Sequence, residues 1–277
     1  MTRRSHVVPM KNPVLQDHLP SAPWMDAGSW RLPGVRPLEE NIWLFSDDAF
    51  AGQMALRDGL IGTVPEDVHA MLPEAKEAAL ECLELVLDYC RSHGGYCVEG
   101  DQVVRPDGVE VPLTQEEPLL TIGQLIQEDV CILQSGDQGE HLLTGAILCF
   151  PASWTLSEKI GRPLTRIHKP VESYGVVAHR VQRMFDRVRP ETPLCRQNAL
   201  LYEQPDLYQP RGEADGTRHI SGEGKYLRSE RQSVLKLLRT GALVFAIHTF
   251  VVEVASLPSD QRRMLHRVIS RHDEGSE

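Results

Sequence analysis

The stretch ALVFAIHTFVVEVA, residues 242–255, decides the fold. It is apolar at nearly every position, and an extended segment that is apolar on both faces is typical of a central strand of a sheet. Residues 194–204 predict a second strand, and the Gly-rich, polar residues 211–224 between the two predict a flexible loop. We therefore expect a sheet with residues 242–255 in its middle.

Outward from this strand, the pattern predicts mixed α/β structure. Residues 130–133 and 141–150 predict two strands, joined by a turn around residues 135–137. Residues 73–93 and 174–187 predict helices, because their apolar residues recur at a spacing of three and four.

Shorter signals predict the connections. Thr155-x-x-Glu158 resembles a capping box that opens a short helix, which Gly161 ends. The Pro-rich residues 1–37 predict an extended arm, with Trp24 and Trp30 as its anchors.

Composition excludes several classes of protein. The 277 residues are 41% hydrophobic and 25% charged, close to ordinary globular usage, and correspond to one or two domains. The sequence contains no run of about 18 apolar residues, so it predicts no membrane span. No apolar segment follows the basic first residues, so it predicts no secretory signal. Six cysteines without a Cys-x-x-Cys pair predict reduced, mostly buried thiols rather than a zinc site, and a cytoplasmic location.

The charge is unevenly distributed. With 29 basic and 39 acidic residues the net charge is −10, which disfavours nucleic acid and anionic membranes as partners. Residues 66–140 are rich in acids, whereas residues 162–189 are basic, so the second half of the chain could still form a local basic surface.

His168 is the first candidate for chemistry. It precedes Lys169-Pro170 in a loop between two predicted helices, and rigidly held loops often carry ligands and catalytic groups. A loop histidine that is merely structural is the commoner case, and both interpretations remain open. The sequence contains no His-x-x-x-His pair, no Gly-x-Ser-x-Gly elbow, no phosphate-binding Gly-Lys-Ser/Thr loop and no Gly-x-Gly-x-x-Gly after a strand.

Arginines form the second group of candidates. Arg228, Arg231 and Arg239 crowd the segment that enters the buried strand, and Arg196 and Asn198 enter the other strand. Guanidinium groups bind carboxylates bidentately, so the group predicts either anion recognition or an exposed charged segment. Glu230 is a candidate for binding a cation or handling a proton, or else for a salt bridge to a neighbouring arginine.

These residues together resemble a known family. The runs Phe150-Pro-x-x-Trp154 and Glu158-Lys159-x-Gly161-x-Pro163-Leu164-x-x-Ile167-His168-x-Pro170-Val171 are similar to the signature of the haem-dependent oxidative N-demethylases and of the haem subunit of dimethylamine monooxygenase. Pro193-x-x-Arg196-x-Asn198, Leu227-Arg228-x-Glu230-Arg231-Gln232 and Arg239-Thr240-Gly241-Ala242 fit the same pattern, over roughly residues 40–255. This sequence departs from it at Ala199 and Leu238, where the family usually has Trp and Pro, and at His248, where the family often has Arg.

The resemblance implies the fold and the roles of residues. It implies an α/β (α+β) fold with a PAS-like antiparallel sheet, flanking helices and an N-terminal arm, and b-type haem. We then expect the arm in residues 1–37, the haem domain with a helical insertion in residues 38–255, and a C-terminal helix or tail in residues 256–277. His168 is implied as the iron ligand. Cofactor-binding residues, for the haem propionates or an anionic substrate, would be Arg196, Asn198, Arg228, Arg231 and Arg239, with Glu230 as the catalytic candidate.

The implied activity is that of a haem-dependent monooxygenase. Family members oxidise amines with O2 and electrons from NADPH, delivered by a reductase that carries FMN and an iron–sulfur cluster. Here that reductase would be a separate chain, and the substrate a small amine or an amino-acid-like molecule; a homo-oligomer is left open. The alternatives are a PAS-type sensor or binding protein for haem or a small ligand, and a scaffold that has lost its haem.

Overall fold

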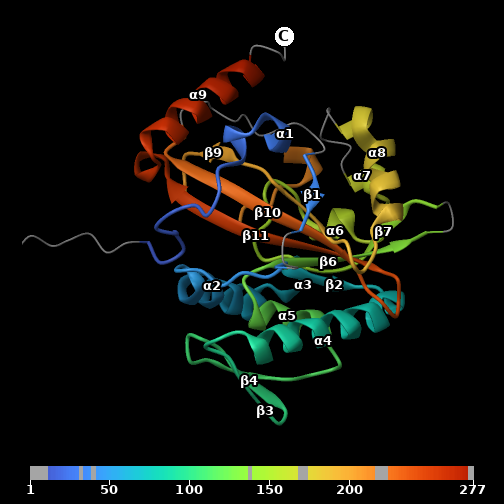
Figure 1. Ribbon diagram of the computed structural model, residues 1–277. Helices are drawn as coiled ribbons and strands as arrows, with labels where there is room; N and C mark the ends of the chain where they lie inside the picture. Colours follow the sequence, from blue (N-terminus) through green and yellow to red (C-terminus); the bar gives the residue numbers. More distant parts are fainter. Residues whose placement is uncertain are drawn as a thin grey trace, which may run out of the picture.

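The computed structural model describes residues 12–30, 34–38, 42–136, 139–167, 174–215 and 224–273. Within these ranges, one antiparallel sheet forms the centre of the molecule (Figure 1). Its strands follow the spatial order β1 (Arg36–Pro37), β8 (Leu194–Gln197), β10 (Tyr226–Lys236), β11 (Leu243–Glu253), β6 (Asp129–Ser135), β7 (His141–Ile147) and β2 (His69–Met71), while β9 (Leu200–Tyr202) also pairs with β10. The prediction that residues 242–255 form a central strand is confirmed, because β11 lies between β10 and β6.

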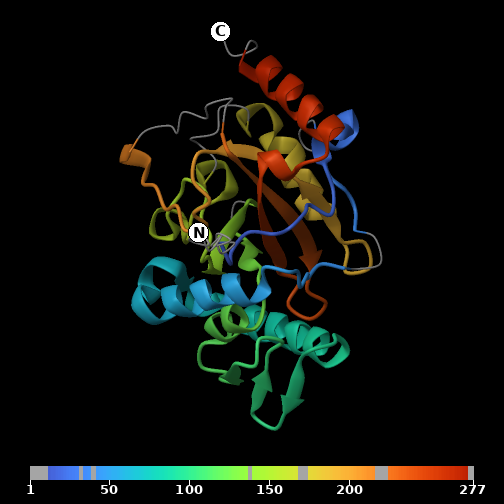
Figure 2. The ribbon, with the colours of Figure 1, turned by 90° about the vertical axis from the view of Figure 1, so that its left-hand side faces the viewer.

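Helices cover both faces of this sheet, so the fold is α+β (Figures 1 and 2). The helices packed on one face are α2 (Phe50–Thr63), α3 (Pro65–Val68), α4 (Lys76–Ser92) and α5 (Pro118–Leu125), and below them lies a small second sheet of β3 (Cys97–Glu99), β4 (Gln102–Val104) and β5 (Glu110–Pro112). On the other face are α6 (Leu156–Lys159), α7 (Leu164–Ile167) and α8 (Tyr174–Arg187). The remaining helices are α1 (Ala27–Trp30) and α9 (Ser259–Asp273), and short 3-10 turns span Pro23–Met25, Pro73–Ala75, Glu213–Asp215 and Val254–Ser256.

Two predicted helices are confirmed almost to the residue. The first begins as a turn at Pro73 and continues as α4, whose apolar face buries Cys82, Val86 and Cys90. Gly95, just beyond it, has a φ of +96°, a conformation that favours glycine. The second is α8, which has the predicted bounds 174–187. In both cases an apolar stripe on a polar helix gave an unambiguous period.

One strand was not predicted, and two local predictions need correction. Residues 226–236 form the long central strand β10, which the polar run Arg-Ser-Glu-Arg-Gln-Ser conceals. The predicted strand 194–204 is two strands, β8 and β9, both paired to β10. The short helix predicted after Thr155 is present as α6, but its capping box is wrong. The Thr155 hydroxyl donates to the Glu158 carboxylate (2.8 Å) and caps no backbone N–H, and Glu158 also accepts the backbone N–H of Glu213.

The N-terminal segment packs on the end of the sheet. Trp24 is buried and its indole N–H donates to the Gln261 carbonyl in α9 (2.9 Å), so its predicted anchoring is confirmed, and Trp30 is partly buried in the same cluster. Leu265 holds α9 to that cluster. The division into an arm, a domain and a tail stays a prediction. No helix in the described ranges combines the length and apolarity that a membrane crossing requires.

Candidate functional site

The two faces of strand β10 carry chemically different side chains. Side chains alternate along a strand, so Arg228, Glu230, Gln232 and Val234 share one face. Val234 packs with α7 and α8 through Leu164 and Phe185, so this is the face toward those helices. We call it the α8 face. Arg231 lies on the opposite face with Leu235, which packs in the cluster of α4 and α5.

A row of polar side chains crosses the α8 face. Asn198 of the β8–β9 segment, Glu230 of β10 and Thr249 of β11 lie side by side, because Glu230 pairs with Thr249 and the backbone N–H of Asn198 donates to the Glu230 carbonyl (3.0 Å). The Asn198 amide donates to Glu230 Oε2 (3.1 Å), and its oxygen accepts the Glu230 N–H (2.9 Å). Gln232 also donates to Glu230 Oε2 (3.2 Å), and Arg196 lies opposite Gln232 in the sheet.

Arg228 links the α8 face to two loop segments through hydrogen bonds. It is buried, and it donates to the carbonyls of Leu207 (3.0 Å) and Phe150 (2.5 Å). It also forms an ion pair with Glu230 (3.3 Å). Its donors are thus used within the chain, and the salt bridge considered as the alternative role of Glu230 is present.

The α8 face also carries unsatisfied polar atoms. Among the described residues, five buried side-chain nitrogen or oxygen atoms have no hydrogen-bond partner, and two of them, Arg196 Nε and Thr249 Oγ1, lie on this face. Burial lowers the pKa of Arg196, and the nearby charge of Glu230 opposes that shift. Buried polar groups are normally paired, so these two atoms are a donor and a hydroxyl that a bound polar group could satisfy.

The opposite face holds an ionic cluster around His248. His248 Nδ1 lies 2.9 Å from Glu128 Oε1, and Nε2 lies 3.1 Å from Asp47 Oδ2. Burial alone would lower the pKa of His248, but the two carboxylates outweigh it and raise the pKa to about 9. Burial would likewise raise the pKa of Asp47, yet its bond to His248 and the amides of Gln127 and Gln16 lower it to about 2. His248 and Asp47 are therefore both charged at neutral pH.

Two of the predicted arginines lie away from the α8 face. Arg231 stacks its guanidinium on Phe45 (4.6 Å to the ring centroid) and donates to the Ile42 carbonyl and to the Ser233 hydroxyl. Arg239 lies at the exposed β10–β11 turn and pairs with Glu84 of α4 (2.7 Å), while its backbone N–H donates to Glu81. Of the predicted residues, the structure thus brings together Arg196, Asn198, Arg228 and Glu230.

A second cluster fixes the end of α7. Glu213 accepts hydrogen bonds from Lys159 (2.8 Å) and bidentately from Arg166 (2.7 and 2.8 Å). Those bonds lower the pKa of Glu213 to about 2. The carboxylate of Glu158 accepts the Glu213 N–H (3.1 Å), so several residues of the quoted 158–171 run hold one loop in place. Arg166 precedes His168 by two residues.

His168 itself lies outside the described residues, so its predicted role stays a prediction. Within the described ranges, no group of three or more His, Cys, Asp or Glu side chains is arranged to hold a metal ion. Haem iron needs only one such side chain from the protein.

The fold is an α+β fold whose central sheet carries a row of polar side chains on its α8 face. The model of the family described as haem-dependent oxidative N-demethylase, alpha subunit-like, matches residues 34–276, and the chain belongs to this family. The family indicates an oxidoreductase with haem-dependent oxidative demethylase chemistry. Its designation as alpha subunit-like indicates an enzyme with more than one kind of subunit.

Sequence reasoning missed Thr249 and the cluster of Asp47, Glu128 and His248. The His248-Thr249 pair interrupts an otherwise apolar strand, and two adjacent polar residues in a central strand point to opposite faces. That signal could have indicated polar partners on both faces. Asp47 and Glu128 come from distant segments, and no pattern in the sequence links them to His248.

Proposed function

We propose that this chain is the haem-binding subunit of an amine monooxygenase that removes an N-methyl group. The haem would be of the b type, with His168 as the iron ligand and the α8 face of β8, β10 and β11 beside it. The observation that supports this most is the buried, unpaired Nε–H of Arg196 on the α8 face of a chain that belongs to a haem-dependent family.

The residues present fit the group. A haem carries two propionate carboxylates, and a buried guanidinium N–H without a partner is a donor that a propionate satisfies. Arg228 has no such capacity, because its donors serve the carbonyls of Leu207 and Phe150. Arg231 and Arg239 lie away from the α8 face, so their positions do not support a propionate contact. We therefore assign the propionate contact to Arg196.

Glu230 is proposed to hold the protonated amine. Two amides, from Asn198 and Gln232, and the guanidinium of Arg228 orient its carboxylate in the row. A fixed carboxylate favours a cationic amine over a neutral analogue, and burial strengthens that preference. The Thr249 hydroxyl, directly beside Glu230 in the sheet, offers the amine or a water molecule one further hydrogen bond.

The reaction needs electrons from outside the chain. One N-methyl amine, one O2, two electrons and two protons give the demethylated amine, formaldehyde and water. A bound haem supplies the oxygen chemistry, and the protein supplies position and charge. NADPH would deliver the electrons through a separate reductase that carries FMN and an iron–sulfur cluster.

The test combines turnover with a stoichiometry. The protein, reconstituted with haem, is mixed with NADPH, a flavin/iron–sulfur reductase and a secondary N-methyl amine. We expect NADPH consumed and formaldehyde formed in equal amounts, and both lost in Glu230→Gln while haem is retained. Haem binding without amine-dependent formaldehyde would support the PAS-type sensor instead. Absence of haem binding would contradict both.

A further inference from the structure

Helix α8 presents a stripe of arginines to solvent. Arg180, Arg183 and Arg187 are all exposed, and their spacing of three and four residues places them on one side of the helix. From the first to the last the stripe runs about 10 Å along the helix axis, at 1.5 Å per residue. The other side of α8 is held to the core by Phe185, with Val181 and Met184 packed against the same cluster.

Folding does not explain this stripe. Like charges three and four residues apart destabilise a helix. Elsewhere in the described ranges Arg91, Arg105 and Arg166 each have a carboxylate within 3 Å. In those same ranges no carboxylate pairs with Arg180, Arg183 or Arg187. Asp186, the acid nearest in sequence, instead accepts a hydrogen bond from Gln182 (2.8 Å).

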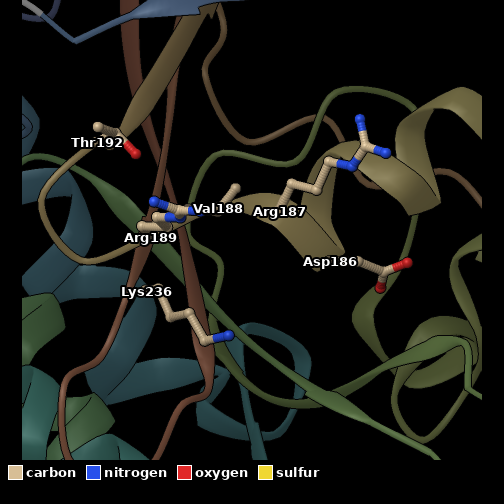
Figure 3. A pocket seen from close by; sticks show the side chains of 6 residues that line it. All are labelled: Asp186, Arg187, Val188, Arg189, Thr192 and Lys236. Carbon is tan, nitrogen blue, oxygen red and sulfur yellow. The ribbon is translucent and has the colours of Figure 1, made fainter.

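The stripe continues into a hollow beyond the end of α8. This hollow has a volume of about 650 Å³, and Figure 3 shows the side chains around it. Arg187, exposed Arg189 and Lys236 at the end of β10 contribute three cationic groups, against one carboxylate from Asp186. Val188 and Thr192 complete the lining. The basic surface thus extends from α8 to the main sheet.

We propose that this surface, Arg180, Arg183, Arg187, Arg189 and Lys236, is where an acidic electron-donor protein docks. The inference rests on the proposed function, because a haem subunit without its own reductase must receive electrons from a partner. The helix begins six residues after His168, so the proposed docking surface and the proposed iron ligand are neighbours in the sequence.

Charge and size favour such a partner over a nucleic acid or a membrane. The whole chain has a net charge of −10, which repels extended polyanions, whereas a local patch can still attract a small acidic protein. Electron-transfer complexes have small interfaces and rely on complementary charge for fast association. A stripe of about 10 Å with an adjoining hollow suits an interface of that kind.

The test uses charge reversal with a matched control. The variant Arg183→Glu/Arg187→Glu reverses two exposed charges four residues apart on α8. The control Arg263→Glu/Arg267→Glu reverses two exposed charges with the same spacing on α9. The probe is an oxidised plant-type [2Fe–2S] ferredoxin, a small acidic electron carrier, and its equilibrium binding is measured at low and high salt. This measurement needs no haem in the chain, so it stays decisive if the proposed function fails.

We expect the α8 reversal to weaken ferredoxin binding at least tenfold at low salt, and the α9 control to change it less than twofold. The difference should vanish near 0.5 M salt, where charges are screened over a few ångström. In haem-loaded protein, reduction by the ferredoxin should slow in the α8 variant, while reduction by dithionite should not. No binding by the unaltered protein, or equal losses in the two variants, would overturn the proposal. Tighter, stripe-dependent binding to anionic phospholipid vesicles would overturn it in favour of a membrane.

Discussion

Nδ1 of His248 lies 2.9 Å from Oε1 of Glu128, and both side chains are buried. The second ring nitrogen faces Asp47, so one imidazolium joins β11 to two segments that are distant in the sequence. A buried charge is tolerated only when it is paired, and here the imidazolium of His248 lies between two carboxyl groups. Strand β11 thus carries a buried cation at His248.

Removal of this cation should destabilise the fold strongly. We expect His248→Gln to lower the free energy of unfolding by about 3–5 kcal/mol, because Glu128 and Asp47 would remain buried without their counter-charge. Urea denaturation measures this, and His18→Gln, at an exposed histidine, is the control. A loss no larger than that of the control would show that the cluster is not ionised.

The same cluster predicts a pH dependence of stability. The pKa of His248 is raised from 6.5 to about 9 in the folded protein, so its contribution is complete below 6.5 and is lost as the pH rises through 9. The pKa of Asp47 is lowered from 3.8 to about 2, so its contribution is complete above 3.8 and is lost as the pH falls toward 2. The Tm difference between the unaltered protein and His248→Gln should therefore be largest from about pH 4 to 6.5 and shrink as the pH rises from 6.5 to about 9. A difference that grows over this range would contradict the assignment.

Two glycines of α2 should respond to alanine in opposite ways. A Cβ at Gly52 would lie 2.0 Å from the Pro13 carbonyl oxygen, a contact that forces the N-terminal segment away from the helix. A Cβ at Gly59 meets nothing within 4 Å. We expect Gly59→Ala to stabilise the protein by about 0.5–1 kcal/mol through helix propensity, and Gly52→Ala to destabilise it. Thermal denaturation of both variants checks this, and equal effects would mean that Pro13 is not packed on α2.

The sequence predicts best where one physical signal dominates. The apolar stretch of β11 and the stripes of α4 and α8 follow from hydrophobic burial alone, and they are found at the expected positions. Strand β10 escaped prediction because it lies in the middle of the sheet and yet carries Arg228, Glu230 and Gln232. Its burial depends on hydrogen bonds to loops and neighbouring strands, which no local period encodes.

The residue types of the candidate site could be predicted from the sequence, but their arrangement could not. The motif pointed to arginines of β10, but only register decides which face each side chain occupies. One residue of offset separates Glu230, in the polar row, from Arg231, which stacks on Phe45. Thr249 entered the site solely through its pairing with Glu230.

This separation of faces gives a direct comparison of two arginines. Arg196→Gln should weaken haem retention about 10- to 100-fold, the loss expected for one charge-assisted hydrogen bond to a propionate. Arg231→Gln, on the opposite face, should leave retention nearly unchanged. The rate of haem transfer to apomyoglobin measures both. A larger effect from Arg231→Gln would show that the haem lies on the face opposite to the α8 face and would contradict our account.

The most direct test of the central claim is the absorption spectrum of the haem-reconstituted protein, oxidised, reduced with dithionite, and with carbon monoxide. We predict a Soret band that shifts with carbon monoxide as for a histidine-ligated haem. That band should be lost in His168→Ala, restored by added imidazole, and unchanged in His18→Ala. A protein that takes up no haem, or a His168→Ala variant whose spectrum matches the unaltered protein, would contradict the account.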